Sequence, residues 1–148
     1  MEQKYNVRQV TAEDYTCINE WYSQRKELRP KSILLPNGGL DGFIIEKNNK
    51  PIAVIYLYLT NSKMGYMDFL ISDPNYKNKD KYNMIMELQD ACTEALLRKG
   101  CRIVWAMTSY DHLAEMAGKM GHEVLEKKHH IIYTHEKVYK EITKKKEV

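Results

Sequence analysis

The fold is decided by a stretch that begins Tyr66-Met-Asp-Phe-Leu-Ile-Ser72 and closes with Cys101-Arg-Ile-Val-Trp105. Between these apolar runs lie a polar loop and a long segment with apolar residues at helical spacing, which ends at Gly100. The pattern predicts a strand, a loop, a helix and a second strand. Two strands joined in this way almost always form a right-handed crossover between parallel neighbours.

The loop of this unit has the character of an anion site. It reads Asp73-Pro-Asn-Tyr-Lys-Asn-Lys-Asp-Lys-Tyr82 and leads directly into the predicted helix. The first N–H groups of a helix have no partner within the helix, and the helix dipole favours negative charge there. The loop can therefore hold phosphate groups. The alternative is that its lysines are simply solvated, as most surface lysines are.

Length and composition indicate one ordinary globular domain. A chain of 148 residues suits a single core, and 43% hydrophobic with 29% charged residues excludes a disordered chain. A net charge of +3 is too small to imply nucleic-acid binding by itself. The N-terminus lacks the apolar segment of a secretory signal, no apolar run is long enough for a membrane span, and the three cysteines lack metal-site spacing. We expect a reduced, cytoplasmic protein that makes no membrane contact.

The other segments predict further strands and helices around this unit. Before it, we expect strands over residues 5–10, 42–46 and 51–60, and a helix over residues 12–25. After it, we expect a helix over residues 112–120 and strands over residues 123–127 and 129–135. The strand at residues 101–107 is expected to be buried. This order predicts an α/β fold in which helices flank a mixed, mostly antiparallel central sheet, in one domain over residues 1–138 with a charged tail at 139–148.

The order of elements resembles that of the GCN5-related N-acetyltransferase (GNAT) family, over about residues 5–135. The family's loop signature is Arg/Gln-x-x-Gly-x-Gly/Ala, often preceded by Val-x-Pro-x-Tyr. Here Pro74 and Tyr76 match, Lys77 stands in the place of Arg or Gln, and Asp80 and Tyr82 replace the two glycines. The segment from Leu113 to His122, which reads Leu-Ala-Glu-Met-Ala-Gly-Lys-Met-Gly-His, is similar to the family's Ala-x-x-x-Tyr-x-Lys-x-Gly-Phe.

The resemblance implies that acetyl-CoA is the acyl donor, bound in a gap where the fourth strand splays from the fifth. In the family, backbone amides of the fourth strand bind the pantetheine arm, and the loop at the helix start binds the pyrophosphate. The implied cofactor-binding residues are Phe69, Leu70, Ile71, Ser72, Lys77, Asn78, Lys79, Lys81, Tyr82 and Ser109.

The resemblance also suggests catalytic groups. Asp68 lies inside an otherwise apolar strand and is the best-placed general base, unless it faces solvent or accepts a structural hydrogen bond. Tyr110 is the candidate acid for the leaving thiolate, because the family's own tyrosine falls at Ala117, which has no hydroxyl. His112 either acts as an acid or base or is an ordinary residue at a helix start. We expect no metal site.

The leading hypothesis is an acyl-CoA-dependent N-acyltransferase. It would move an acetyl group to a primary amine, on a small molecule or a protein, by direct attack on the thioester. The alternative is a non-catalytic GNAT-like module that has lost the cofactor, since Asp80 and Tyr82 stand where glycine allows close backbone contact with phosphate. Such a module would bind a protein partner or form a homodimer, for example through the apolar loop at residues 33–35. Nucleic-acid binding through Lys144, Lys145 and Lys146 together with Lys127 and Lys128 is a weaker hypothesis.

Overall fold

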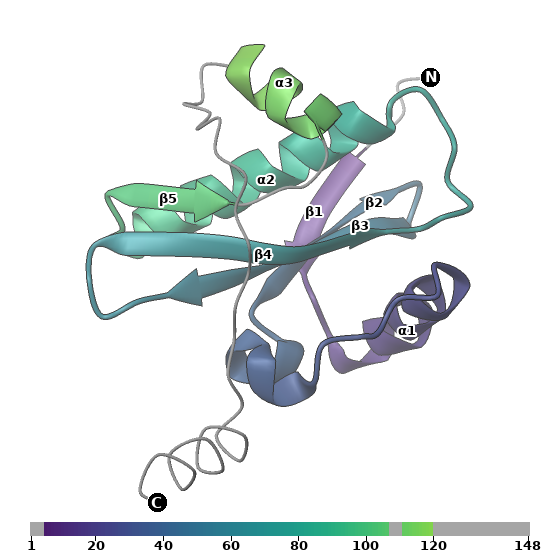
Figure 1. Cartoon of the computed structure of the whole chain (residues 1–148), viewed down its shortest axis with the longest axis horizontal. Coiled ribbons are helices and arrows are strands. Elements are labelled where there is room, and N and C mark those ends of the chain that lie inside the picture. The colour runs from purple at the N-terminus through teal and green to yellow at the C-terminus, as the bar shows by residue number, and fades with distance from the viewer. Residues whose placement is uncertain (1–4, 107–110, 120–148) are drawn as a thin grey trace, which may run out of the picture.

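In the part of the chain that the structure describes, a five-stranded sheet is the central element, and helices lie on both of its faces (Figure 1). The computed structural model describes residues 5–106 and 111–119. The strands are β1 (Tyr5–Gln9), β2 (Gly42–Lys47), β3 (Lys50–Leu59), β4 (Met64–Ser72) and β5 (Ile103–Ala106), and the α-helices are α1 (Tyr15–Gln24), α2 (Lys81–Arg98) and α3 (Asp111–Lys119). The strands follow one another in the order of the chain, and each pair is antiparallel except β4 and β5. The predicted α/β fold with a mixed, mostly antiparallel sheet is confirmed.

The crossover unit that the sequence predicts is present. β4 and β5 pair in parallel from Met64 opposite Ile103 to Met67 opposite Ala106, and α2 connects them. Gly100 has a φ of +100° just after α2, a conformation that ends a helix readily only at glycine or asparagine. Among the described residues, the rest of β4 continues past its last pair with β5 and pairs with β3 alone.

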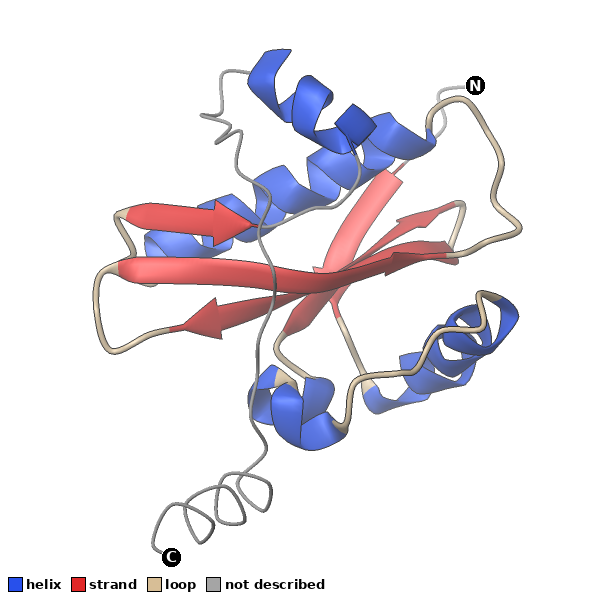
Figure 2. Cartoon of the chain, in the orientation of Figure 1, coloured by secondary structure: helices blue, strands red, loops and turns tan. Residues whose placement is uncertain are grey.

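The sheet is buried on both faces, and the core is divided accordingly. Figure 2 shows the red strands between α1 on one side and α2 with α3 on the other. On the α2 side, Ile85, Leu88, Cys92 and Leu96 pack against the sheet, and on the α1 side Ile18 and Trp21 do so. β3 is buried from Ile52 to Leu57, as its apolar residues on both faces predict.

A tight turn joins β2 to β3. Asn48 and Asn49 have φ values of +51° and +66°, which is the pattern of a two-residue type I′ turn. Asparagine tolerates this left-handed region better than most residues. The turn fixes Lys47 at the end of β2, where its ammonium group contacts Asp80, the residue just before α2.

Several details differ from the sequence predictions. The helix expected over residues 12–25 is divided into a 3₁₀ turn, Ala12–Asp14, followed by α1. The helical spacing of apolar residues puts Tyr82 on the packed face of this helix, but on α2 Tyr82 is exposed and Met84 and Met86 are buried. The helix begins at Lys81, so Tyr82 lies in its first turn. In the loop at residues 33–35, Leu35 alone is buried, since it packs between α1 and β2.

The prediction that the fifth strand is buried is wrong for the described residues. β5 is short, and Ile103 and Trp105 remain 60% and 44% exposed. Only Val104, on the alternate face, packs against the α2 side of the core. β5 lies at one end of the described strand order, and the alternating residues Ile103 and Trp105 share its exposed face. The strands expected at 123–127 and 129–135 and the tail at 139–148 lie outside the described residues. Among those residues, no helix is long and apolar enough to cross a membrane.

Candidate functional site

A β-bulge interrupts β4 where the sequence places the cofactor strand. Tyr56 pairs with Asp68 and Val54 pairs with Ile71, so two residues of β4, Phe69 and Leu70, lie opposite a single residue of β3. Phe69 has a φ of +56°, which is uncommon for a residue other than glycine. Bulges bend a strand and change the direction of its backbone groups, and strained backbone of this kind clusters at functional sites.

Asp68 precedes the bulge and is held by two hydrogen bonds. The Tyr66 hydroxyl donates to one carboxylate oxygen over 2.8 Å, and the Phe69 backbone N–H donates to the other over 2.7 Å. The carboxylate is therefore oriented, and the predicted structural hydrogen bond is present. The Phe69 amide, one of the donors expected to bind the cofactor, is already used by Asp68.

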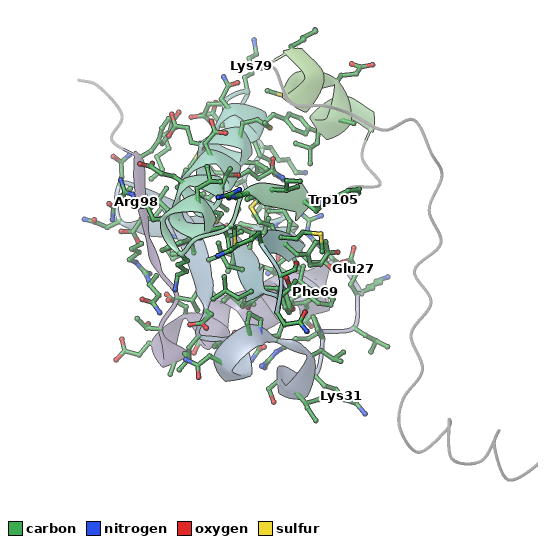
Figure 3. The ribbon with its side chains drawn as sticks, turned by 90° about the vertical axis from the view of Figure 1, so that its left-hand side faces the viewer. Glu27, Lys31, Phe69, Lys79, Arg98 and Trp105 are labelled. Atoms are coloured by element: carbon green, nitrogen blue, oxygen red, sulfur yellow. The ribbon has the colours of Figure 1, made fainter. Side chains whose placement is uncertain are left out.

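Tyrosines surround Asp68 on the α1 side of the sheet. The rings of Tyr58 and Tyr66 lie 5.8 Å apart, centroid to centroid. Burial raises the pKa of the Tyr22 hydroxyl to about 12, and the negative charges of Glu27 and Asp68 contribute. Figure 3 shows Glu27 and Phe69 on the same side of the molecule, with Trp105 above them. This side therefore combines aromatic rings with two carboxylates, which suits a cationic group.

The end of β4 is tied to the end of α1. Arg25 donates from Nε to the Ser72 carbonyl oxygen over 3.0 Å and from a terminal nitrogen to Ser72 Oγ over 2.9 Å. Asn75 in the following loop donates to Gln24 over 3.0 Å. Ser72 itself is buried. These bonds hold the exit of β4 in place and bring a guanidinium group to it.

The loop that follows β4 carries the predicted anion-binding residues. Lys77, Asn78 and Lys79 are exposed, and Lys79 projects outward near the start of α2 (Figure 3). Lys81 is half-buried. Burial lowers the pKa of its ammonium group, the nearby positive charge of Arg25 lowers it further, and Asp73 opposes both effects. Lys81 and Arg25 thus bring two positive charges to one end of the site.

Asp80, which replaces a family glycine, is turned toward β1 and β2. Its carboxylate accepts a bond from Lys47 Nζ at 2.8 Å, a bond from the Tyr76 hydroxyl at 2.5 Å and a short bond from the Tyr5 hydroxyl. Burial of Asp80 opposes ionisation, but these three donors outweigh it and hold the pKa at about 2. The negative charge at this position is therefore paired at neutral pH.

Three predicted residues cannot be placed in this site. Ser109 and Tyr110 lie outside the described residues, as does the side chain of His112. Their proposed roles remain predictions. Among the residues that the structure describes, no group of three or more His, Cys, Asp or Glu side chains could hold a metal ion.

Comparison with solved structures gives clear matches in fold. The ribosomal-protein-S18-alanine N-acetyltransferase of Escherichia coli superposes with a TM-score of 0.62 at 13% identity, over 80% of this chain and 77% of that one. The aminoglycoside N-acetyltransferase AAC(6')-Iy in complex with CoA superposes with a TM-score of 0.62 at 16% identity, over 92% of this chain and 97% of that one. A GCN5-related N-acetyltransferase of Ralstonia eutropha JMP134 superposes with a TM-score of 0.61 at 15% identity, over 87% of this chain and 99% of that one.

The chain has the GNAT fold. Neither the protein-family models nor the curated protein sequences match it. At these low identities the structural match establishes the GNAT fold, while the chemistry has to be argued from the side chains. The predicted residues Asp68 to Ser72 and Lys77 to Tyr82 lie on β4, on the loop after it and at the start of α2.

Sequence reasoning missed two residues of this candidate site. Arg25 contacts Ser72 from 47 positions away, and Lys47 contacts Asp80 from 33 positions away. No local pattern marks either contact. The one available signal for Lys47 is its place beside the Asn48-Asn49 turn, which puts it at a sheet end.

Proposed function

We propose that the chain is an acetyl-CoA-dependent N-acetyltransferase that acts on a primary amine. The observation that carries this proposal is the bulge at Phe69, set in a GNAT fold between an oriented carboxylate and a cationic loop. Backbone of β4 would hold the pantetheine arm, and Arg25 with Lys77, Lys79 and Lys81 would face the phosphates. When bound, acetyl-CoA supplies the activated acyl group as a thioester.

The charges of the loop fit a polyphosphate ligand. Three lysines and a nearby guanidinium supply positive charge, and the loop's own acid at position 80 is paired with Lys47. The fit is electrostatic, and it does not depend on the glycines that the family uses for close backbone contact.

Asp68 is the proposed base. Its carboxylate would take a proton from the substrate ammonium, directly or through one water, so that the neutral amine can attack the thioester carbonyl, while Tyr66 holds the carboxylate in place. Nearby rings and Glu27 would favour a cationic acceptor before it loses its proton. Tyr110 is the proposed acid for the leaving thiolate.

Calorimetric titration with acetyl-CoA tests the cofactor, and release of free CoA thiol tests turnover. The amine panel should include an aliphatic polyamine, an aminoglycoside and a peptide with a free N-terminus. We expect binding in the micromolar range and thiol release with at least one amine. No binding at millimolar acetyl-CoA would rule out the enzyme.

A non-catalytic module is the second candidate. Asp80 and Tyr82 in place of glycines, and the use of the Phe69 amide by Asp68, favour it. Binding of acetyl-CoA without thiol release from any amine in the panel would support a binding module rather than an enzyme.

A further inference from the structure

The carboxylate of Asp80 is enclosed by partners from three parts of the chain. Lys47 comes from the end of β2, Tyr5 from the start of β1 and Tyr76 from the loop before α2. The side chain of Lys47 is 8% exposed and that of Asp80 is 19% exposed. A pair this sheltered from solvent is screened little by salt.

Lys47 is itself fixed between two aromatic rings. Its Nζ lies 5.8 Å from the ring centroid of Tyr5 and 5.5 Å from that of Tyr76, and it donates to the Tyr76 hydroxyl over 3.0 Å. The ammonium group is therefore held between the Tyr76 hydroxyl and the Asp80 carboxylate.

Two adjacent charged residues of the loop, Asp80 and Lys81, point in opposite directions along the sheet. Asp80 reaches toward β1 and β2, at one end of the strand order. The next residue, Lys81, lies near Asp73 and Arg25, and Arg25 bonds to Ser72 at the end of β4. The Asp80 carboxylate is thus directed away from β4, the strand that carries the bulge, and the Lys81 ammonium group is directed toward it.

We infer that Lys47, with Tyr5 and Tyr76, is a positioning residue that allows Asp80 to stand in place of glycine in an anion-binding loop. Lys47 neutralises the carboxylate, and the three donors together turn it from the side that would receive the cofactor. The carboxylate of Asp80 then no longer opposes a diphosphate group that the lysines of the loop would bind. This inference rests on the proposed binding of CoA at the same loop.

The test measures the affinity of the full chain for CoA and for inorganic diphosphate by calorimetry. The variants are Lys47→Met, Asp80→Asn, the double variant Lys47→Met/Asp80→Asn, and the control Lys50→Met. Lys50 pairs with Lys47 across the same hairpin and is exposed, so the control removes the same charge without freeing Asp80. Thermal unfolding of each variant checks that it is folded.

We expect Lys47→Met to weaken binding of both ligands by about tenfold or more, because it leaves a sheltered carboxylate unpaired. Asp80→Asn in that background should return the affinity to within about threefold of the wild-type value, since no charge remains to be paired. Lys50→Met should change it by less than about threefold.

Two results would overturn the inference. One is a folded Lys47→Met variant that binds as tightly as wild type, and the other is a folded double variant as weak as Lys47→Met. If wild type binds diphosphate but not CoA, the proposed cofactor is wrong, and the diphosphate affinities of the variants still decide the role of Lys47. If wild type binds neither ligand, both proposals fail.

Discussion

The Tyr66 hydroxyl donates a 2.8 Å hydrogen bond to the Asp68 carboxylate, two residues along the same face of β4. Burial raises the pKa of Tyr66, and the bond to Asp68 raises it further, so the tyrosine remains a donor at neutral pH. The second carboxylate oxygen accepts the Phe69 N–H in the bulge. One side chain thus links the strained backbone to the aromatic side of the site.

If Asp68 is the base, Asp68→Asn should lower kcat by about 10²- to 10⁴-fold, because the amide cannot take the amine proton. Tyr66→Phe should lower kcat by about tenfold, because the Asp68 carboxylate loses its orientation but remains a proton acceptor. The control is Tyr58→Phe, whose hydroxyl bonds to the Leu34 carbonyl oxygen instead. Initial rates of CoA release give the comparison. An Asp68→Asn rate within threefold of wild type would assign the base elsewhere.

Arg25→Met should raise KM for acetyl-CoA by about tenfold and change kcat less, because it removes binding that ground and transition states share. The substitution also releases Ser72 from both of its bonds to the guanidinium. Arg29→Met is the matched control. Arg29 lies 4.5 Å from the ring centroid of Tyr15 and bonds to Asn19, and no bond from it to Ser72 is found among the described residues. Equal effects in the two variants would mean that Arg25 acts only through overall charge.

The crossover unit was predictable because each part of it has a local signal. The apolar runs, the helical spacing and Gly100 are all written in consecutive residues, and the hairpin at Asn48 and Asn49 is likewise local. The exposure of Trp105 was not predictable, because an apolar run in the sequence is the same for a strand at the edge of a sheet as for one at its centre.

The site was predictable only in outline. The resemblance located β4 and the loop, but the bulge at Phe69 arises from the register of β4 on β3 and has no glycine to mark it. Asp80 looked like an obstacle to phosphate, because its partner Lys47 is distant in sequence. Tertiary contacts of this kind decide the electrostatics of a loop, and single-residue patterns do not contain them.

Arg8 should contribute to stability more than any surface ion pair. It bonds to both oxygens of buried Asp14, at 2.8 and 2.7 Å, and to buried Glu46 at 3.1 Å. Arg8→Met should lower the free energy of unfolding by about 2–4 kcal/mol, since it leaves two buried carboxylates without their cation. Arg98→Met, which breaks an exposed pair with Glu94, should cost less than about 0.5 kcal/mol. Urea unfolding distinguishes them, and similar losses would contradict the assignment.

Asp80 predicts a specific loss of stability in acid. Its folded pKa of about 2 lies below the usual value for an unfolded aspartate of about 3.9. A carboxyl group whose pKa is lower in the folded state stabilises the fold at pH values above its unfolded-state pKa. This stabilisation disappears as the pH falls through its folded-state pKa. The difference in unfolding free energy between wild type and Asp80→Asn should therefore shrink from about pH 4 to about pH 2. Urea titrations at several pH values measure it, and a constant difference would contradict the paired state.

Gly65 sets how closely α2 and β5 approach β4. A Cβ at this position would lie 3.0 Å from Cys101 Sγ and 3.2 Å from both terminal methyl groups of Leu96. Both neighbours are buried, so they have little room to move. Gly65→Ala should therefore cost about 1–3 kcal/mol of unfolding free energy by overpacking.

Cys101→Ala offers the internal control for Gly65, because it removes the nearest atom. The double variant Gly65→Ala/Cys101→Ala should lose less stability than the sum of the two single losses, which is the sign of a shared contact. Urea unfolding of the four proteins completes the cycle. Strict additivity would mean that Cys101 does not limit the space, and that the backbone of β4 yields instead. Such yielding would shift the strand that carries Asp68 and the bulge, so acetyl-CoA affinity should be measured on the same four proteins.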